Sequence, residues 1–127
     1  MTHVAASFDS VVESFRNEIF SGYKTGEGIE QDLLDQFPLA ERAMRAIGVT
    51  VWSMYDYEAD DGLATGARRW VDDVEQVVVM SPDKDLCQLY DDPRIVGYDR
   101  RKGAFIDRDV VVDKFGVEPA SIPDWLA

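Results

Sequence analysis

The sequence predicts an α/β fold built on a mainly parallel sheet with helices on both faces. Three short apolar runs, at residues 2–8, 49–54 and 75–80, have the length and β-branched content of buried strands. Segments with apolar residues at three- and four-residue spacing follow the first two runs, as amphipathic helices would. Strands that alternate with helices are joined by right-handed crossovers and lie mostly parallel. A length of 127 residues, 46% of them hydrophobic, suffices for one domain core.

The first half of the chain begins with an apolar run from Thr2 to Phe8 that ends at Asp9. Residues 11–28 show no clean period and contain four turn-prone residues, which predicts an irregular, mobile segment with one short helix around 13–20. A helical pattern then runs from Leu33 to Ile47, with Gly48 at the C-cap position. Pro38 must either kink this helix or begin its second half.

The second half predicts two further strands, a helix between them and a mixed carboxyl-terminal part. Val49–Met54 and Glu75–Met80 are the strands, and 58–71 is the helix that connects them. Ser81 and Pro82 have the residue types of an N-cap and first helical position, so a helix is expected to run from there through Leu89. The remaining expected elements are strands at 94–98 and 104–106 around the basic turn Arg100, Arg101, Lys102, Gly103, and a last helix at 107–115 closed by Gly116.

The charge balance argues at first against nucleic acid as a partner. The chain has 25 acidic and 13 basic residues and a net charge of −12, whereas a protein that binds the phosphate backbone usually has a basic excess. Carboxylates that converge on divalent cations can still form a site for phosphate, because the bound metals reverse the local field. The positions of the acids are therefore more informative than their number.

Other features of the composition predict a cytoplasmic protein that does not interact with membranes. The sequence has no apolar run long enough to cross a bilayer, and its first residues do not resemble a signal peptide. The single cysteine, Cys87, has no neighbouring Cys or His at metal-ligand spacing, which is typical of a reducing compartment. We expect Cys87 to pack in the core.

Acidic residues follow each of the three predicted strands. The first strand is followed by Asp9, the second by Glu58, Asp60 and Asp61 in the segment YEADD, and the third by Asp83 and Asp85 in SPDKD. In open α/β sheets the ligand site lies beyond the carboxyl ends of the strands, so these acids are expected to converge. Glu58 and Asp61 are three residues apart and would share one helix face.

A cluster of five or six carboxylates needs compensating positive charge. Oxygen ligands without Cys or His favour Mg²⁺ or Mn²⁺, and a pair of such ions would activate water for phosphodiester cleavage. The alternative is structural, because Asp and Glu at helix starts also cap the helix. An α/β phosphatase with an aspartyl nucleophile is a further alternative. Such an enzyme needs a second Asp two residues after the nucleophile, and only Asp83 and Asp85 have this spacing.

Three segments together resemble the bacterial 5′-nuclease domain, the 5′-3′ exonuclease and flap endonuclease family found at the amino terminus of DNA polymerase I. They are FDSVVESFRNEIFSGYK near the start, YEADD after the second strand and SPDKDLCQL after the third, and their order and spacing match the family. The resemblance implies a PIN-like core, roles in DNA replication and repair, and Mg²⁺ or Mn²⁺ as cofactor, with two ions in a complete site. It implies metal ligands at Asp9, Glu58, Asp60, Asp61, Asp83 and Asp85.

The resemblance also implies substrate-side residues. Arg16 in SFRNE and Lys24 in GYK match family positions that face DNA, with Lys24 at the base of a mobile arch and next to the scissile phosphate. Tyr23 is a candidate platform for base stacking. Judged without the resemblance, Lys24 would be a solvated lysine and Tyr23 a packing residue. Glu27 stands where the family usually has an arginine, and this reversed charge should weaken phosphate binding.

The resemblance divides residues 1–127 into a partial catalytic core with 13–30 as the arch-like segment. Residues 107–127 would lead into the helices that clamp DNA in the family. Compared with the family, the chain is expected to lack the first strand, with its ligand Asp, and these clamp helices. A missing segment or a partner chain could complete the sheet.

The predicted function is metal-dependent hydrolysis of DNA near 5′ ends or flaps, as an exonuclease or structure-specific endonuclease. The alternative from a different class is a non-catalytic fragment or degenerate paralogue that only binds DNA or a partner chain.

Overall fold

The computed structural model describes residues 1–20, 23 and 28–127. The chain forms two compact units, Met1–Gly62 and Leu63–Ala127, and each is described by itself. The boundary falls inside helix α4 (Ala59–Trp70), after its first turn. The assignment of residues 1–127 to one partial catalytic core stays a prediction.

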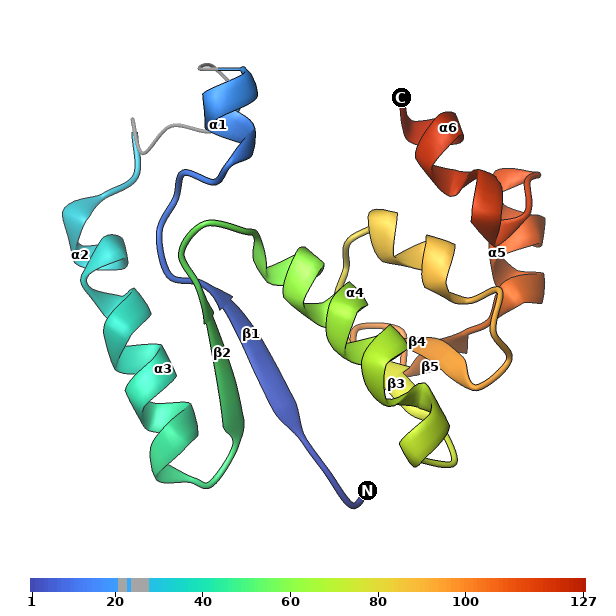
Figure 1. Ribbon diagram of the computed structural model, residues 1–127, viewed down its shortest axis with the longest axis horizontal. Coiled ribbons are helices and arrows are strands. Elements are labelled where there is room, and N and C mark those ends of the chain that lie inside the picture. Colours follow the sequence, from blue (N-terminus) through green and yellow to red (C-terminus); the bar gives the residue numbers. More distant parts are fainter. Residues whose placement is uncertain (21–22, 24–27) are drawn as a thin grey trace. The chain divides into compact units, whose positions relative to one another are not determined.

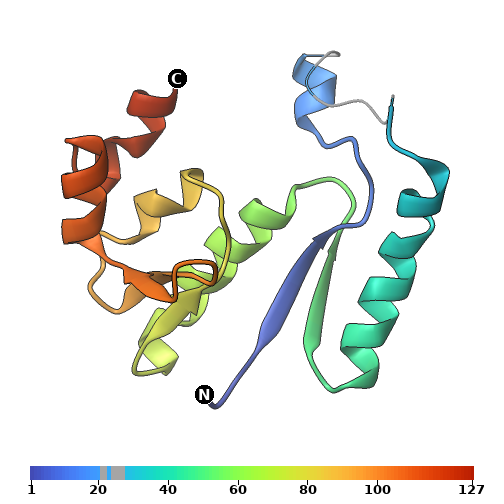
Figure 2. The ribbon, with the colours of Figure 1, turned by 180° about the vertical axis from the view of Figure 1, so that it is seen from behind.

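The first unit is built on two parallel strands, β1 (Ala5–Asp9) and β2 (Thr50–Met54). Their register pairs Ala5 with Thr50 at one end and Asp9 with Met54 at the other. Three helices connect them, α1 (Arg16–Ile19), α2 (Gln31–Leu34) and α3 (Gln36–Ala46), and α3 lies alongside β2 (Figures 1 and 2). Asp9 therefore ends β1, as predicted, although the strand begins three residues later than expected.

The predicted helix from Leu33 to Ile47 is divided into α2 and α3 at Asp35, which ends the first helix and begins the second. Pro38 lies in the first turn of α3, where its missing N–H removes no helical hydrogen bond. This confirms that Pro38 belongs to the start of the second half. Gly48 follows α3 with φ of 86°, a left-handed conformation that favours glycine.

The second unit contains most of α4 and a three-stranded sheet. Strand β4 (Ile95–Asp99) lies in the centre, parallel to β3 (Val77–Val79) and antiparallel to β5 (Ala104–Ile106). The other elements are the short 3₁₀ helices η1 (Val71–Asp73), η2 (Asp85–Leu89) and η3 (Pro119–Ser121), and the helices α5 (Arg108–Phe115) and α6 (Ile122–Leu126). The chain is thus a mixed α/β structure with parallel strand pairs, as predicted.

The core of the second unit draws on nearly every element of that unit. Val111 of α5 and Ile122 of α6 are completely buried, and Leu86 of η2 is almost so. Cys87 is buried in the same cluster, as predicted, and burial raises the pKa of its thiol. Burial of these apolar side chains is the main stabilising contribution to this unit.

The predicted helix start at Ser81 and Pro82 is wrong. The hydroxyl of Ser81 accepts a hydrogen bond from the amide of Asp83, and Asp83 Oδ1 accepts one from the amide of Asp85 at 2.8 Å. These local bonds hold residues 81–84 in turns, and only the short helix η2 follows. In contrast, the last helix is confirmed, because Asp107 caps α5 through the amide of Val110 and Gly116 closes it with φ of 74°.

Within the part of the chain that the structure describes, no helix has the length and apolar character needed to span a membrane.

Candidate metal and nucleic-acid site

Carboxylates from the end of β1 and the start of α4 bind the first amides of that helix. Asp9 Oδ1 accepts a hydrogen bond from the amide of Ala59 at 2.7 Å, and Asp61 Oδ2 accepts one from the amide of Glu58 at 3.0 Å. The capping role weighed from the sequence for acids at helix starts is therefore real for Asp61, and Asp9 caps the same helix from the end of β1. It also brings the strand-end carboxylate of Asp9 to the first turn of α4, which carries the YEADD acids.

Arg16 of α1 binds two of these acids directly. Its Nη1 donates to Glu58 Oε2 at 2.7 Å and to Asp61 Oδ2 at 3.0 Å, and its Nη2 donates to Asp61 Oδ1 at 3.0 Å. Glu58 and Asp61 thus share one helix face, as their spacing predicted. The hydrogen bonds to Asp61, together with the charges of Asp61 and Glu58, outweigh partial burial and raise the pKa of Arg16.

Aromatic side chains hold Arg16 in this position. Its guanidinium carbon lies 4.8 Å from the centre of the Phe15 ring, and that ring lies 5.2 Å from the ring of Tyr57. The amide of Phe15 donates to the carbonyl of Asp56 at 2.7 Å, which attaches the start of α1 to the loop after β2. Arg16 is consequently ordered against the acids and does not extend freely into solvent.

The donor chemistry of this region fits a hard divalent cation. The predicted ligands here offer only oxygen atoms, from Asp9, Glu58, Asp60 and Asp61. Two of them, Glu58 and Asp61, already bind the positively charged Arg16. Among the described residues, no three His, Cys, Asp or Glu side chains come close enough together to hold a metal ion. Arg16 thus occupies oxygens of two acids that the resemblance assigns to a metal.

Asp83 and Asp85 belong to the second unit, so their convergence with Asp9 and Glu58 stays a prediction. Within their own unit the two acids are adjacent in space, because Asp83 accepts the hydrogen bond from the amide of Asp85. Asp83 precedes η2 and Asp85 is its first residue.

The substrate-side residues are only partly described. Lys24 and Glu27 lie outside the described residues, as do four others of the predicted arch, so both the role of Lys24 and the mobility of 13–30 stay predictions. Tyr23 is exposed, and its hydroxyl lies 3.4 Å from Glu58 Oε2. Tyr23 and Arg16 therefore both contact Glu58.

Glu41 of α3 is a buried carboxylate that the sequence analysis missed. Only 6% of Glu41 is exposed, and Ser10 Oγ donates to its Oε1 at 2.5 Å. Arg45 Nη2 donates to Oε2 at 3.1 Å, and the hydroxyl of Ser53 donates to the same oxygen. Because Ser10 directly follows Asp9, these bonds tie α3 to the end of β1. The available signal was Ser53, a polar residue within the apolar run VTVWSM.

We expect Glu41 to stabilise the fold in a pH-dependent way. Desolvation alone would raise its pKa, but the hydrogen bonds from Ser10, Ser53 and Arg45 outweigh desolvation and lower it. A lowered folded-state pKa means that the stabilisation is present above the ordinary glutamate pKa and is lost as pH falls through the folded value. Glu41→Gln should cost about 2 kcal/mol at pH 7, and this cost should shrink below about pH 4.

Urea unfolding between pH 3 and pH 7 measures this difference. The exposed Glu75, replaced by Gln, is the control and should change the unfolding free energy little at any pH. A cost for Glu41→Gln that grows on acidification would contradict the assignment.

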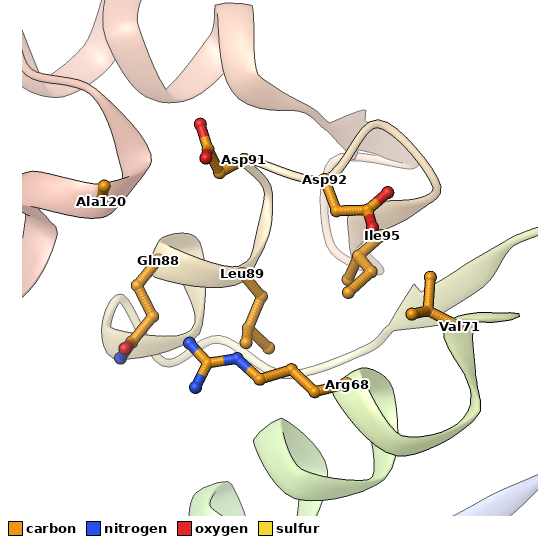
Figure 3. Close-up of a pocket in the computed structure, with 8 residues that line it drawn as sticks. All are labelled: Arg68, Val71, Gln88, Leu89, Asp91, Asp92, Ile95 and Ala120. Atoms are coloured by element: carbon orange, nitrogen blue, oxygen red, sulfur yellow. The ribbon is translucent and has the colours of Figure 1, made fainter.

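An open cavity of about 440 Å³ lies in the second unit (Figure 3). Its floor is apolar, with Val71, Leu89 and Ile95, and the Arg68 side chain extends across it toward Gln88. None of the residues that line it is a predicted site residue, so sequence reasoning did not indicate this cavity. The other residues that line the cavity are Asp91, Asp92 and Ala120.

The fold and the acids define an α/β protein with carboxylates gathered at a strand end and the following helix start. Residues 1–116 match the family described as 5′-3′ exonuclease, N-terminal resolvase-like domain, and the chain belongs to this family. The match runs from the amino terminus through α5, so it includes every predicted metal-binding acid.

Three relatives have similar sequences over nearly the whole chain. DNA polymerase I of Mycobacterium leprae (strain TN) is 34% identical over 99% of this chain and 14% of its own length. The 5′-3′ exonuclease of Aquifex aeolicus (strain VF5) is 32% identical over 98% of the chain and 43% of its own length. The flap endonuclease Xni of Yersinia enterocolitica is 35% identical over 98% of the chain and 50% of its own length. The chain thus spans at most half the length of these relatives.

The fold is also found among solved structures. The T5 D15 protein, co-crystallised with metal ions, superposes with a TM-score of 0.71 at 15% sequence identity, over 91% of this chain and 47% of the T5 protein.

Proposed function

We propose that this chain is part of the catalytic region of a Mg²⁺- or Mn²⁺-dependent 5′-nuclease that hydrolyses DNA phosphodiesters near 5′ ends or flaps. The observation that carries the proposal is that Asp9, at the end of β1, binds the amide of Ala59 at the start of α4, where Glu58 and Asp61 bind Arg16, in a chain of this family. The names of the relatives, a 5′-3′ exonuclease and a flap endonuclease, support the substrate class. The metal ions of the T5 D15 crystal support the cofactor class.

The residues that would hold the Mg²⁺ or Mn²⁺ ions are the six acids that the family resemblance assigns: Asp9, Glu58, Asp60, Asp61, Asp83 and Asp85. When bound, the ions supply an activated water and stabilise the leaving oxygen. The backbone amides of Ala59 and Glu58 donate hydrogen bonds to the Asp9 and Asp61 carboxylates, respectively, and so orient them. The amide bond takes one oxygen of Asp9, whereas both oxygens of Asp61 also accept hydrogen bonds from Arg16, which a cation would have to displace.

Arg16, Tyr23 and Lys24 are the proposed DNA-facing residues. Arg16 carries a planar guanidinium that can bind phosphate through two parallel hydrogen bonds, as it now binds Asp61. Tyr23 exposes an aromatic ring on which a base can stack. Lys24 is assigned to the scissile phosphate from the family resemblance alone. We place the protein in the cytoplasm, in DNA replication and repair.

The test is a cleavage assay with the protein at the full length that its gene encodes. A flap substrate labelled at its 5′ end should release short labelled products with Mg²⁺ or Mn²⁺ and none with EDTA. A covalently closed single-stranded circle, which has no 5′ end, is the control substrate and should stay intact. Binding of the flap without cleavage in either metal would instead support the non-catalytic alternative, and equal cleavage of the circle would refute a requirement for 5′ ends.

A further inference from the structure

The turn between β4 and β5 carries a basic cluster that the acid site does not use. Arg100, Arg101 and Lys102 are consecutive, and they make up three of the 13 basic residues in a chain of net charge −12. All three are exposed. Neither Arg100 nor Arg101 forms an ion pair with any residue that the structure describes, and Lys102 Nζ lies 4.0 Å from Asp99 Oδ2. Within the part of the chain that the structure describes, Asp99 offsets part of this positive charge through its interactions with Arg101 and Lys102.

The backbone of this turn is held in a fixed shape. Asp99 Oδ1 accepts hydrogen bonds from the amides of Arg101 at 2.9 Å and Lys102 at 3.1 Å, and the amide of Gly103 donates to the carbonyl of Asp99 at 2.8 Å. Gly103 has φ of 65°, which closes the turn. The bond from the Lys102 amide is the main reason that the pKa of Asp99 is lowered. The Asp99 carboxylate thus fixes the backbone of the turn that carries the three basic side chains.

Aromatic residues lie beside the basic turn. Tyr98 and Phe105 face each other across the β4–β5 ladder, with ring centres 5.1 Å apart in an edge-to-face arrangement. Phe105 is 58% exposed in spite of this contact. Cationic side chains next to an exposed ring are the combination that binds a nucleic-acid backbone and an adjacent base.

We propose that the β4–β5 hairpin is a separate DNA-contact surface, in which Arg100, Arg101 and Lys102 bind backbone phosphates and Phe105 packs against a base or sugar. The inference rests on the proposed function for the identity of the ligand. Charge is the physical reason, because a chain of net charge −12 repels DNA unless local basic surfaces offset that repulsion. The fixed turn reduces the entropy lost on binding.

The test replaces all three basic residues with Gln in the protein at the full length that its gene encodes. The hydrogen bonds that shape the turn come from backbone amides, so the hairpin should keep its structure, which circular dichroism and thermal unfolding would verify. Three exposed basic residues elsewhere, Arg42, Arg69 and Lys114, replaced together by Gln, give a control with the same change in net charge. Binding of a fluorescent flap DNA is followed by anisotropy in EDTA, at several salt concentrations.

The hairpin variant should bind DNA at least about tenfold more weakly, with a salt dependence flatter by about two to three units in log–log slope, as the loss of three phosphate contacts predicts. The control should change affinity by less than about threefold. Phe105→Leu should weaken binding to single-stranded DNA by about fivefold without changing the salt slope, because stacking involves no counterion release. Equal losses in the hairpin variant and the control would overturn the proposal, since only net charge would then matter.

The result separates this proposal from the proposed function. Unchanged DNA affinity in the hairpin variant, in a protein that cleaves flaps with metal, would refute the hairpin and leave the nuclease assignment intact. A protein that never cleaves but loses DNA affinity in the hairpin variant would support the hairpin alone. Labelled polyglutamate serves as a non-nucleic-acid polyanion, and a hairpin-dependent affinity for it equal to that for DNA would overturn DNA as the ligand in favour of an acidic protein.

Discussion

Asp83→Asn should lower metal-dependent cleavage of a 5′ flap by on the order of 100-fold or more, measured in the full-length protein. The reason is that asparagine removes the charge that binds a cation but keeps the shape of the side chain. Asp83 Oδ1 accepts the amide hydrogen bond of Asp85 at 2.8 Å, and the amide oxygen of asparagine can accept the same bond. The turn before η2 should therefore persist, so that a loss of activity reports on charge.

Asp113→Asn supplies the matched control, because Asp113 is an exposed acid of α5 outside every predicted site. It makes the same change in net charge and should leave cleavage within about twofold of the wild type. The unfolding free energy of both variants should differ from that of the wild type by less than about 0.5 kcal/mol, as is usual for exposed substitutions. Full activity in Asp83→Asn would remove Asp83 from the metal site.

Local signals account for the parts of the fold that the sequence predicted well. The strands at 50–54, 95–99 and 104–106 come from short β-branched or aromatic runs, and α5 from an Asp at its start and a Gly at its end. The helix expected at Ser81 failed because local side-chain bonds competed with it. The hydroxyl of Ser81 and the carboxylate of Asp83 accept amides two residues on, which stabilises turns where a propensity argument favours a helix.

The contacts of the candidate site could not be predicted, because they join residues far apart in the sequence. Arg16 binds Glu58 and Asp61, which are 42 and 45 positions away, and Glu41 binds Ser10 at a distance of 31 positions. Spacing predicted that Glu58 and Asp61 share a helix face, but not that a cation of the chain lies against that face. The resemblance indicated Arg16 as a DNA-facing residue, whereas the structure shows it bound to predicted metal ligands.

Removal of Arg16 should therefore tighten metal binding while it weakens DNA binding. The guanidinium holds one oxygen of Glu58 and both oxygens of Asp61, and the Glu58 side chain is only 13% exposed, so water replaces these bonds poorly. A metal ion must displace Arg16 from these oxygens or bind without them. A hydrogen bond to a charged group contributes about 1.5–3 kcal/mol, and about 1.4 kcal/mol is a factor of ten in affinity.

Isothermal titration of Arg16→Met should accordingly show a Kd for Mn²⁺ about tenfold lower than that of the wild type, and anisotropy should show weaker binding of flap DNA. Arg94→Met is the matched control, since Arg94 also binds two acids, Asp72 at 2.8 Å and Asp92 at 2.9 Å, that are not predicted metal ligands. It should leave the affinity for Mn²⁺ unchanged. If Arg16→Met bound Mn²⁺ no more tightly than Arg94→Met, metal would not compete with Arg16, and Glu58 and Asp61 would not be the ligands. The observed pairing would then be a structural ion pair that fixes α1 to the start of α4.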